Sequence, residues 1–371
     1  MKVLVSRLSG ADTIELDLEP DSTVRDLRAH IENAIGVPAP KLQLVQDGVV
    51  LASDALLGCV DGGHSPQLTL VVSEPPWTLT ASQDGSAKLW DMRAGTCALT
   101  FKGHQGEVNT AVFSPHGTSV LTSSDDRTAK IWMLESGECI KTLLGHRRGV
   151  FSAVFSADAS SVLTASEDGF AKLWDVESGE CIWTLPDHRG KVNSAVFSPD
   201  GLFVLTASDD KTAKLWSMTS SECTQTFTGH TMGVPYAAFS PTDNGASIVT
   251  ASYDGTAKLW TLSGVCTQTL QGHGAGLSSA LFSLDLAFVL TASFDNTAKL
   301  WCVDTGACLR TFEGHLDRVN FAAFSPDDAS VLTASDDGTW RVWNTMTGES
   351  LQTFQGHDGG VMSAYMLHYW A

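Results

Sequence analysis

Serine, aspartate and histidine recur together along most of this chain, and these residue types can carry hydrolytic or metal chemistry. The clearest copy spans residues 204–216, where Ser208, Asp210 and Trp216 follow the spacing Ser-x-Asp-x5-Trp. The same spacing occurs in seven copies, which end at Trp90, Trp132, Trp174, Trp216, Trp260, Trp301 and Trp343. Histidines keep the same period and lie at His104, His146, His188, His230, His273, His315 and His357.

The elements that carry these residues are predicted to be short strands. A period of 41 to 44 residues indicates a repeat architecture. Within a copy, runs such as Val-Leu-Thr-Ala-Ser and Ala-Lys-Leu-Trp are too short for helices, and the Asp-Gly, Asp-Arg, Asp-Lys or Asp-Asn between them favours a turn with φ > 0. Each repeat is therefore expected to hold four strands, as at residues 150–155, 162–166, 171–174 and 181–185.

This pattern resembles the WD-repeat β-propeller family over residues 77–371. The resemblance implies seven blades that close into a ring. The first copy begins at Trp77, already inside a second strand, whereas the segment from Val361 onward repeats a first strand. We therefore expect the C-terminal strand 361–369 to close blade one. Residues 68–73 compete for that place, but their use there would unpair the N-terminal sheet considered below.

The resemblance also bears on the chemistry of the repeated residues. In the family, the His, Ser, Asp and Trp of a repeat form a buried hydrogen-bonded chain. The physics agrees, because a buried tryptophan N–H needs an acceptor and a buried aspartate needs a partner. Seven copies indicate a scaffold rather than a catalytic triad, and the ring would hold the histidines apart. We expect no catalytic residue, no cofactor and no metal site, so the chain is predicted not to be an enzyme.

Residues 1–72 do not repeat. Alternating and apolar runs predict strands at residues 2–5, 13–18, 42–45 and 68–72. Asp21 and the residues after it can cap a helix that Gly36 ends. This β-β-α-β-β order predicts a small α+β grasp fold.

Several motifs in this segment look like ubiquitin nearly end to end. They are residues 1–5, Leu8-Ser9-Gly10, Glu19-Pro20, Thr23-Val24, Gly36-Val37-Pro38, Asp47-Gly48 and residues 68–72. The expected fold class is therefore mainly β: a seven-bladed β-propeller preceded by an N-terminal ubiquitin-like α+β (β-grasp) domain. The short linker 73–76 would join the two.

Departures from the ubiquitin sequence bear on two functions of this domain, its conjugation to other proteins and its binding to receptors. Residues 73–76 stand where the family has its diglycine tail, which implies an integral, non-conjugated copy. Leu8, Val45 and Val71 match the apolar patch through which the family meets its receptors, although Thr69 stands where that patch has a histidine. We expect this patch to bind a ubiquitin-fold receptor, and a role as a folded cap or spacer is the alternative.

Composition narrows the partners further. The formal net charge of -19 argues against direct nucleic-acid binding, which needs clustered Lys and Arg, and it favours neutral or basic proteins. Equivalent repeat positions hold most of the cysteines, a blade apart, so we expect buried free thiols and a reducing compartment, the cytoplasm or the nucleus. No window reaches membrane-spanning length, so no membrane partner is expected.

Positions at which the repeats differ are the candidates for partner binding. In WD-repeat propellers, side chains on the upper face come from three and five residues after the His and from the x of Ser-x-Asp. This rule assigns the partner-binding face to Glu107, Asp125, Phe151, Glu167, Lys191, Asp209, Pro235, Tyr253, Phe294, Arg318 and Met362. Apolar residues beside an arc of carboxylates indicate a protein or peptide partner with an apolar anchor and basic flanks, and ordinary surface scatter is the alternative.

A shorter signal is formed by Trp90, Asp91 and Arg93. Trp-Asp-x-Arg resembles the box by which some propellers dock on cullin-type ubiquitin ligases, and an ordinary blade end is the alternative. The favoured function is a non-enzymatic adaptor, monomeric within a larger complex, whose propeller holds a client while its ubiquitin-like domain docks to a receptor. The alternatives are a substrate receptor of a cullin-type ligase and an assembly factor for a large complex such as the ribosome.

Overall fold

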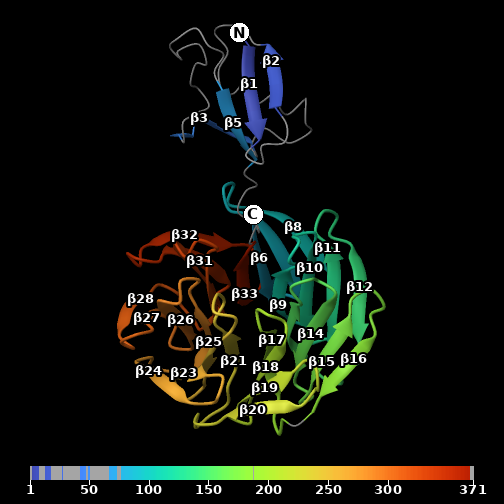
Figure 1. Ribbon diagram of the computed structural model, residues 1–371, viewed down its shortest axis with the longest axis vertical. Helices are drawn as coiled ribbons and strands as arrows, with labels where there is room; N and C mark the ends of the chain where they lie inside the picture. The colour runs from blue at the N-terminus through green and yellow to red at the C-terminus, as the bar shows by residue number, and fades with distance from the viewer. Residues whose placement is uncertain are drawn as a thin grey trace. The chain divides into compact units, whose positions relative to one another are not determined.

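The chain folds into two compact units, Met1–Pro76 and Trp77–Ala371. The structure, a computed structural model, describes residues 2–7, 13–17, 27, 42–46, 49–50, 67–72, 77–186 and 188–367. Each unit has its own sheets (Figure 1).

The described residues of the N-terminal unit form one mixed sheet. Its strands are β1 (Lys2–Arg7), β2 (Thr13–Asp17), β3 (Leu42–Gln46), β4 (Val49–Val50) and β5 (Gln67–Val72). They lie in the order β2-β1-β5-β3-β4, with β1 and β5 parallel and the other neighbours antiparallel. Leu27, from the predicted helix, is helical and fully buried, and the rest of that helix lies outside the described residues. The predicted grasp fold is confirmed.

Within the described residues, the second unit forms seven four-stranded antiparallel sheets, the blades of a propeller. The inner strands of blades one to seven are β33 (Val361–Met366), β9 (Val108–Phe113), β13 (Val150–Phe155), β17 (Val192–Phe197), β21 (Tyr236–Phe239), β25 (Leu277–Phe282) and β29 (Val319–Phe324). The second strands are β6 (Trp77–Ser82), β10 (Ser119–Ser124), β14 (Ser161–Ser166), β18 (Phe203–Ser208), β22 (Ser247–Ala251), β26 (Phe288–Ser293) and β30 (Ser330–Ser335).

Third and outer strands complete each blade. The third strands are β7 (Ser86–Asp91), β11 (Thr128–Met133), β15 (Ala171–Asp175), β19 (Ala213–Ser217), β23 (Thr256–Thr261), β27 (Ala298–Cys302) and β31 (Thr339–Asn344). The outer strands are β8 (Thr96–Lys102), β12 (Cys139–Leu144), β16 (Cys181–Leu185), β20 (Cys223–Phe227), β24 (Cys266–Gln271), β28 (Cys308–Phe312) and β32 (Ser350–Gln355). Figure 1 shows the blades arranged around a common centre.

Blade one is assembled from both ends of the propeller sequence. Its sheet has the order β33-β6-β7-β8, and Ala364 of β33 lies opposite Thr80 of β6 in an antiparallel pair. The backbone N–H of Leu367 donates to the carbonyl of Trp77, which extends the pairing beyond the strand. Residues 368–369 of the predicted strand lie outside the described residues. The closing strand therefore comes from the C-terminal part of the chain, and β5 stays in the N-terminal sheet.

The hairpin between the second and third strands turns through a left-handed residue in every blade. Gly85, Gly169, Gly255 and Gly338 have φ between 79° and 86°. Arg127, Lys211 and Asn296 hold the same place with φ of 75°, 74° and 70°. The tight turn predicted from the Asp-Gly, Asp-Arg, Asp-Lys and Asp-Asn pairs is confirmed, and it brings the aspartate and the third strand back beside the second strand.

The hydrophobic core lies between successive blades. Leu215 and Phe227 of blade four pack against Ala237 and Trp260 of blade five, and all four are buried. The same arrangement recurs around the ring, so each tryptophan that ends a repeat fills the space behind the preceding blade. A blade on its own would expose this face, and its stability depends on its neighbours.

The cysteines do not lie in this core, contrary to the expectation of buried thiols. Cys97, Cys139, Cys181, Cys266 and Cys308 are exposed, whereas Cys223 and Cys302 are half-buried. All the described cysteines are free thiols. The repeated cysteines lie at the start of the outer strands, at the exposed edge of each blade, so their recurrence at equivalent repeat positions did not mean burial.

Candidate functional site

A hydrogen-bonded chain of four side chains runs through every blade. In blade four the indole N–H of Trp216 donates to Thr206 Oγ1 at 2.9 Å, and Thr206 Oγ1 lies 2.8 Å from His188 Nε2. The other ring nitrogen, His188 Nδ1, lies 2.8 Å from Asp210 Oδ2. The equivalent threonines in blades one to seven are Thr80, Thr122, Thr164, Thr206, Thr250, Thr291 and Thr333.

The hydroxyl in this chain is therefore threonine, not the serine that the repeat spacing suggested. Ser208 is fully buried, but its Oγ accepts the backbone N–H of Asp210 at 3.1 Å. In blade three, Ser166 Oγ also donates to the carbonyl of Gly149. The serine thus shapes the turn that presents the aspartate. The sequence analysis did not identify Thr206, although a threonine stands two residues before the serine in all seven copies and this recurrence could have revealed it.

Burial and pairing set the protonation of this chain. Burial lowers the pKa of His104, His146, His230, His273 and His357, although the paired aspartate opposes the shift. These five histidines are therefore neutral near pH 7, and in each of them Nδ1–H donates to the carboxylate while Nε2 accepts the threonine hydroxyl.

The aspartates of the chain stay ionised. Burial opposes ionisation of Asp84, but hydrogen bonds from Ser86 and His357 hold its pKa at about 2. Asp254 likewise has a pKa of about 2, because Thr256, the Thr231 backbone N–H and His230 outweigh the effect of burial. The threonine hydroxyls of the chain are buried, so these residues hold the blades together and offer no accessible nucleophile.

Where the repeats differ, side chains gather at the mouth of the central channel. A cavity of about 220 Å³ opens there, and four of the predicted binding residues line it: Phe151, Pro235, Tyr253 and Met362. They come from the blades three, five and one, and all four are half-buried. The remaining predicted residues of the propeller face lie outside this lining.

Three asparagines that line the same cavity were not predicted. Asn109 donates to Asp125 Oδ1 at 2.8 Å and to the carbonyl of Val150 in the next blade at 3.0 Å. Asn193 and Asn320 make the equivalent bonds to Asp209 and Asp336. All three lie five residues after a repeat histidine, so the rule that found Phe151 and Met362 also pointed to them.

The aromatic pair at the x positions is stacked. The rings of Tyr253 and Phe294 have centroids 5.8 Å apart and an interplanar angle of 23°. The guanidinium of Arg318 lies 5.2 Å from the centroid of Phe294. Burial, followed by the charge of Asp209, raises the pKa of Tyr253 to about 12. Tyr253 therefore presents a neutral phenol to the channel, and Phe294 lies behind it.

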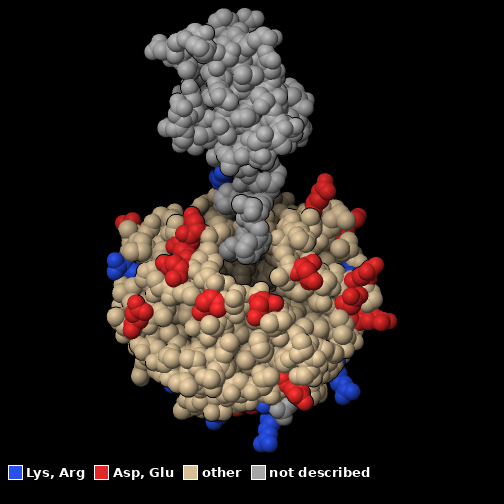
Figure 2. All heavy atoms as spheres, viewed as in Figure 1, with Lys and Arg blue, Asp and Glu red and all other residues tan. Residues whose placement is uncertain are grey.

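Positive and negative side chains are unequally distributed around the mouth. Glu167 pairs with Lys191 at 2.9 Å and with Arg148 at 3.4 Å, and Lys191 Nζ also lies 5.7 Å from the centroid of Phe151. On the other side, Glu107 and Asp125 are exposed and, within the described residues, have no ion pair. Figure 2 shows acidic side chains spread over the propeller face in view, with Lys and Arg nearer its edge.

The Trp-Asp-x-Arg segment has an ordinary structural role in its blade. Trp90 is buried and donates to Thr80 Oγ1 at 2.8 Å. Asp91 Oδ1 accepts the backbone N–H groups of Arg93 and Ala94, which stabilises the turn into β8. Arg93 is exposed. Arg93 is thus accessible at the surface, whereas Trp90 and Asp91 form hydrogen bonds that stabilise the blade.

The positions predicted for the ubiquitin-like patch are only partly described. Val45 in β3 lies opposite Thr69, and Val71 in β5 lies opposite Gln43, so the two valines occupy adjacent paired strands. Leu8 lies outside the described residues.

Two further searches concern metals and membranes. No group of three or more His, Cys, Asp or Glu residues that could hold a metal ion occurs in the described parts of the chain. Among those same residues, no helix is both long and apolar enough to span a bilayer.

Comparisons with known proteins agree with this architecture. Residues 76–301 match the family described as the IFT122 first beta-propeller, residues 306–344 match the WD domain, G-beta repeat, and residues 3–75 match the ubiquitin family. A segment of 64 residues is 42% identical to a guanine nucleotide-binding protein subunit beta of Arabidopsis thaliana and covers 16% of this chain and 17% of that protein. The chain thus spans about a sixth of the length of this curated relative. WD-repeat propellers of this kind are typically non-catalytic interaction scaffolds. The chain belongs to the WD-repeat β-propellers of the IFT122 first beta-propeller family and carries a ubiquitin-family domain before its propeller.

Proposed function

We propose that this chain is a non-enzymatic adaptor whose propeller captures a client protein at the mouth of its channel. The observation that carries the proposal is the gathering of Phe151, Pro235, Tyr253 and Met362 around one cavity, at positions where the repeats differ. The Trp, Thr, His and Asp shared by all repeats bond to one another inside the blades. The four apolar side chains, in contrast, are half-buried at an opening, where a partner can reach them. Such partly exposed apolar clusters favour protein contacts.

The expected client is a protein or peptide with an apolar anchor and basic flanks. The net charge of -19 favours a basic partner, and the exposed carboxylate of Asp125 accepts a hydrogen bond from Asn109 of the cavity lining. The Arabidopsis relative is named as a subunit, which supports a place for this chain within a larger complex. The protein is expected to act in the cytoplasm or the nucleus without contacting nucleic acid or membrane directly.

The ubiquitin-like domain is the second arm of the adaptor. We assign it docking to a receptor that recognises ubiquitin folds, through the patch that includes Val45 and Val71. The match of residues 3–75 to the ubiquitin family supports this role.

Affinity purification of the full chain in parallel with three variants tests both arms. Tyr253→Ala with Phe294→Ala should remove client proteins, and Val45→Asp should remove only the receptor. Val265→Ala is the matched control, because it truncates a 59% exposed apolar side chain outside the channel lining. An identical set of captured proteins in all four samples would refute the proposal.

The same purification separates the alternatives. Cullin-type ligase subunits that disappear with Arg93→Ala would indicate a ligase receptor, and this outcome requires Arg93 alone, since Trp90 and Asp91 stabilise the blade. Co-sedimentation with pre-ribosomal particles would indicate an assembly factor.

A further inference from the structure

The outer edge of four blades carries two nucleophilic side chains beside one hydroxyl, a set that we call a rim cluster. In blade two, Lys130 Nζ donates to Thr142 Oγ1 at 3.0 Å, and Cys139 Sγ lies 3.7 Å from the same oxygen. Blades three, five and six contain the same arrangement, formed by Lys172, Thr184 and Cys181, by Lys258, Thr269 and Cys266, and by Lys299, Thr311 and Cys308. In all four rim clusters, the amine nitrogen and the sulfur lie within 4.0 Å of the threonine oxygen.

The register of the strands brings these side chains together. Lys130 in β11 lies directly opposite Thr142 in β12, so both side chains are on one face of the sheet. A β-bulge sets Cys139 opposite Trp132, and the thiol then lies on the side of Thr142, three residues further along the strand. The same register shift occurs in blades three, five and six. The fold therefore holds an amine and a thiol on the same face of each of these blades.

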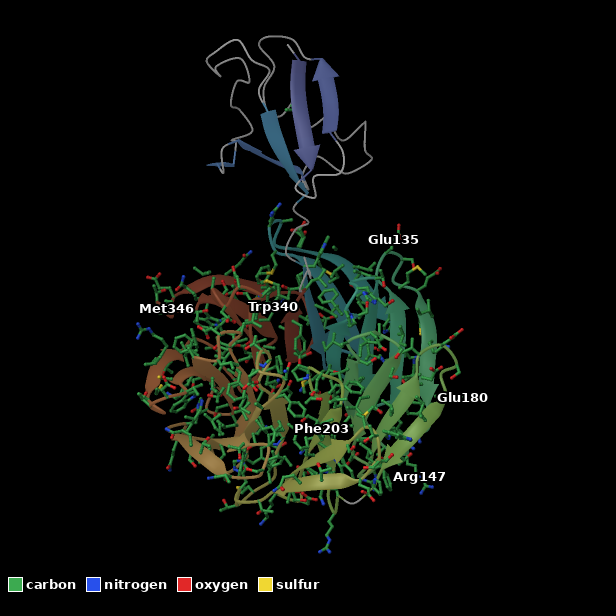
Figure 3. All side chains as sticks on the ribbon, in the orientation of Figure 1. Glu135, Arg147, Glu180, Phe203, Trp340 and Met346 are labelled. Atoms are coloured by element: carbon green, nitrogen blue, oxygen red, sulfur yellow. The ribbon has the colours of Figure 1, made fainter. Side chains whose placement is uncertain are left out.

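The rim clusters are accessible from solution. All four of their cysteines are exposed. Glu180, the residue before Cys181, lies at the outer edge of the ring in Figure 3. Within the described residues, none of the four lysines forms an ion pair with a carboxylate. A small molecule can thus reach the thiol, and no carboxylate holds the amine away from it.

The amine and the thiol of a rim cluster differ in how they react with an acyl donor. Near neutral pH about a few per cent of ordinary cysteine thiols are ionised, whereas almost all lysine amines are protonated. The thiol therefore reacts first with a thioester in solution. The lysine can then attack the acyl group within the same molecule, where its effective concentration is much higher than that of an amine in solution.

We propose that the rim clusters are sites of lysine acylation, in which the cysteine captures an acyl group from a small-molecule thioester and transfers it to the lysine. The cysteine sulfur attacks the thioester carbonyl, the bond to the donor sulfur breaks, and the donor leaves as a free thiol with the proton of the cysteine. The neutral lysine amine then attacks the new thioester, a C–N bond replaces the C–S bond, and one amine proton returns to the cysteine sulfur. The net products are an acyl-lysine and a free donor thiol, without oxidation or reduction. This chemistry does not depend on the proposed adaptor function.

Two other blades provide comparisons within the same chain. Blade one has an exposed cysteine, Cys97, but its lysine, Lys88, donates to the carbonyl of Gly356 instead. Blade seven has Ser350 and Arg341 at the positions of the cysteine and the lysine. Lys88 therefore has the same place in its strand as the cluster lysines but a different hydrogen-bond partner. Ser350 shows that the fold accepts serine in place of the cysteine.

Incubation of the native full chain with acetyl-coenzyme A tests the proposal. The amines that remain are acetylated with an isotope-labelled reagent after denaturation, and peptide mass spectrometry then gives the acetylated fraction of each lysine. The four lysines of the rim clusters should be acetylated about tenfold faster than Lys88, which is a small part of the advantage of intramolecular attack. Blocking the thiols beforehand with N-ethylmaleimide should remove this difference.

A single substitution locates the transfer. Cys139→Ser should lower the acetylation rate of Lys130 about tenfold and leave that of Lys172 unchanged, so each molecule contains its own control. The matched variant, Cys97→Ser, should not change the acetylation rate of Lys88. Both variants should keep the melting temperature of the native protein, because the replaced thiols are exposed.

Three results would overturn the rim clusters as acylation sites. They are equal acetylation rates for Lys88 and the four cluster lysines, an unchanged rate at Lys130 in the Cys139→Ser variant, and an acetyl group that stays on Cys139 without reaching Lys130. None of these results bears on client capture at the channel, so the adaptor function stands or fails separately.

Discussion

Replacing Thr206 with valine should reveal how much the hydrogen-bonded chain of one blade stabilises the ring. Thr206 is fully buried and joins Trp216 and His188 at 2.9 and 2.8 Å. Valine keeps the shape of threonine but leaves the indole N–H and the imidazole Nε2 without partners. Each buried unpaired group costs about 1–3 kcal/mol, so the two together should lower the free energy of unfolding by about 2–6 kcal/mol.

Thermal unfolding of the full chain, followed by tryptophan fluorescence, measures this loss. A large domain loses about 2 °C in melting temperature per kcal/mol, which gives an expected fall of roughly 4–12 °C. Thr206→Ser is the matched control, because it keeps the hydroxyl and loses only a methyl group, at a cost of about 1 kcal/mol. Ser208→Ala should cost less than Thr206→Val, since Ser208 holds only the Asp210 backbone N–H. A Thr206→Val protein as stable as Thr206→Ser would refute the assignment of the threonine as the linking hydroxyl.

Three further predictions concern the whole ring. The buried histidines have pKa values lowered below their ordinary 6.5, so the unfolded state binds more protons as the solution is acidified. Stability should therefore fall between pH 7 and pH 5, by at most about 1.4 kcal/mol per pH unit for each histidine; a melting temperature that is flat or rises on acidification would contradict this. Deleting residues 361–371 removes β33 and should open or unfold the ring, and an unchanged melting curve would disprove that role. Finally, Ellman's reagent should react rapidly with the five exposed repeat cysteines of the native protein, whereas protection of all thiols until denaturation would show that these outer edges are covered.

The fold could be predicted because its determinants repeat. A turn through a left-handed residue, an apolar second strand and a terminal tryptophan recur in all seven copies, so local pattern and ring closure agree. The grasp fold of the N-terminal unit followed from motif and order in the same way. The exposure of the cysteines could not be predicted from the repeat pattern. Apolar and polar residues alternate in outer strands as they do in inner strands, and only the order of strands in the sheet distinguishes the two.

The candidate site was less accessible to sequence reasoning. The rule for upper-face positions found Phe151, Tyr253 and Met362. The same rule reaches Asn109, but its residue type alone does not show that it bonds to Asp125 and to the next blade. Pairing across blades was also invisible: Arg318 lies over Phe294, and Lys191 neutralises Glu167, which changes where the free negative charge remains. Such contacts join residues that are tens of positions apart in the sequence, and they form only when the closed ring brings neighbouring blades together.

The origin of β33 has a consequence for synthesis of the protein. The first blade lacks its inner strand until the ribosome has made the chain from Trp77 to Met366. At about 5–20 residues per second, that interval lasts on the order of 15 to 60 s. Throughout it, β6 exposes an unpaired edge, which is a template for aggregation. A nascent chain that stalls before Val361 would keep this edge exposed, and we expect chaperones to hold β6 until the last strand is released.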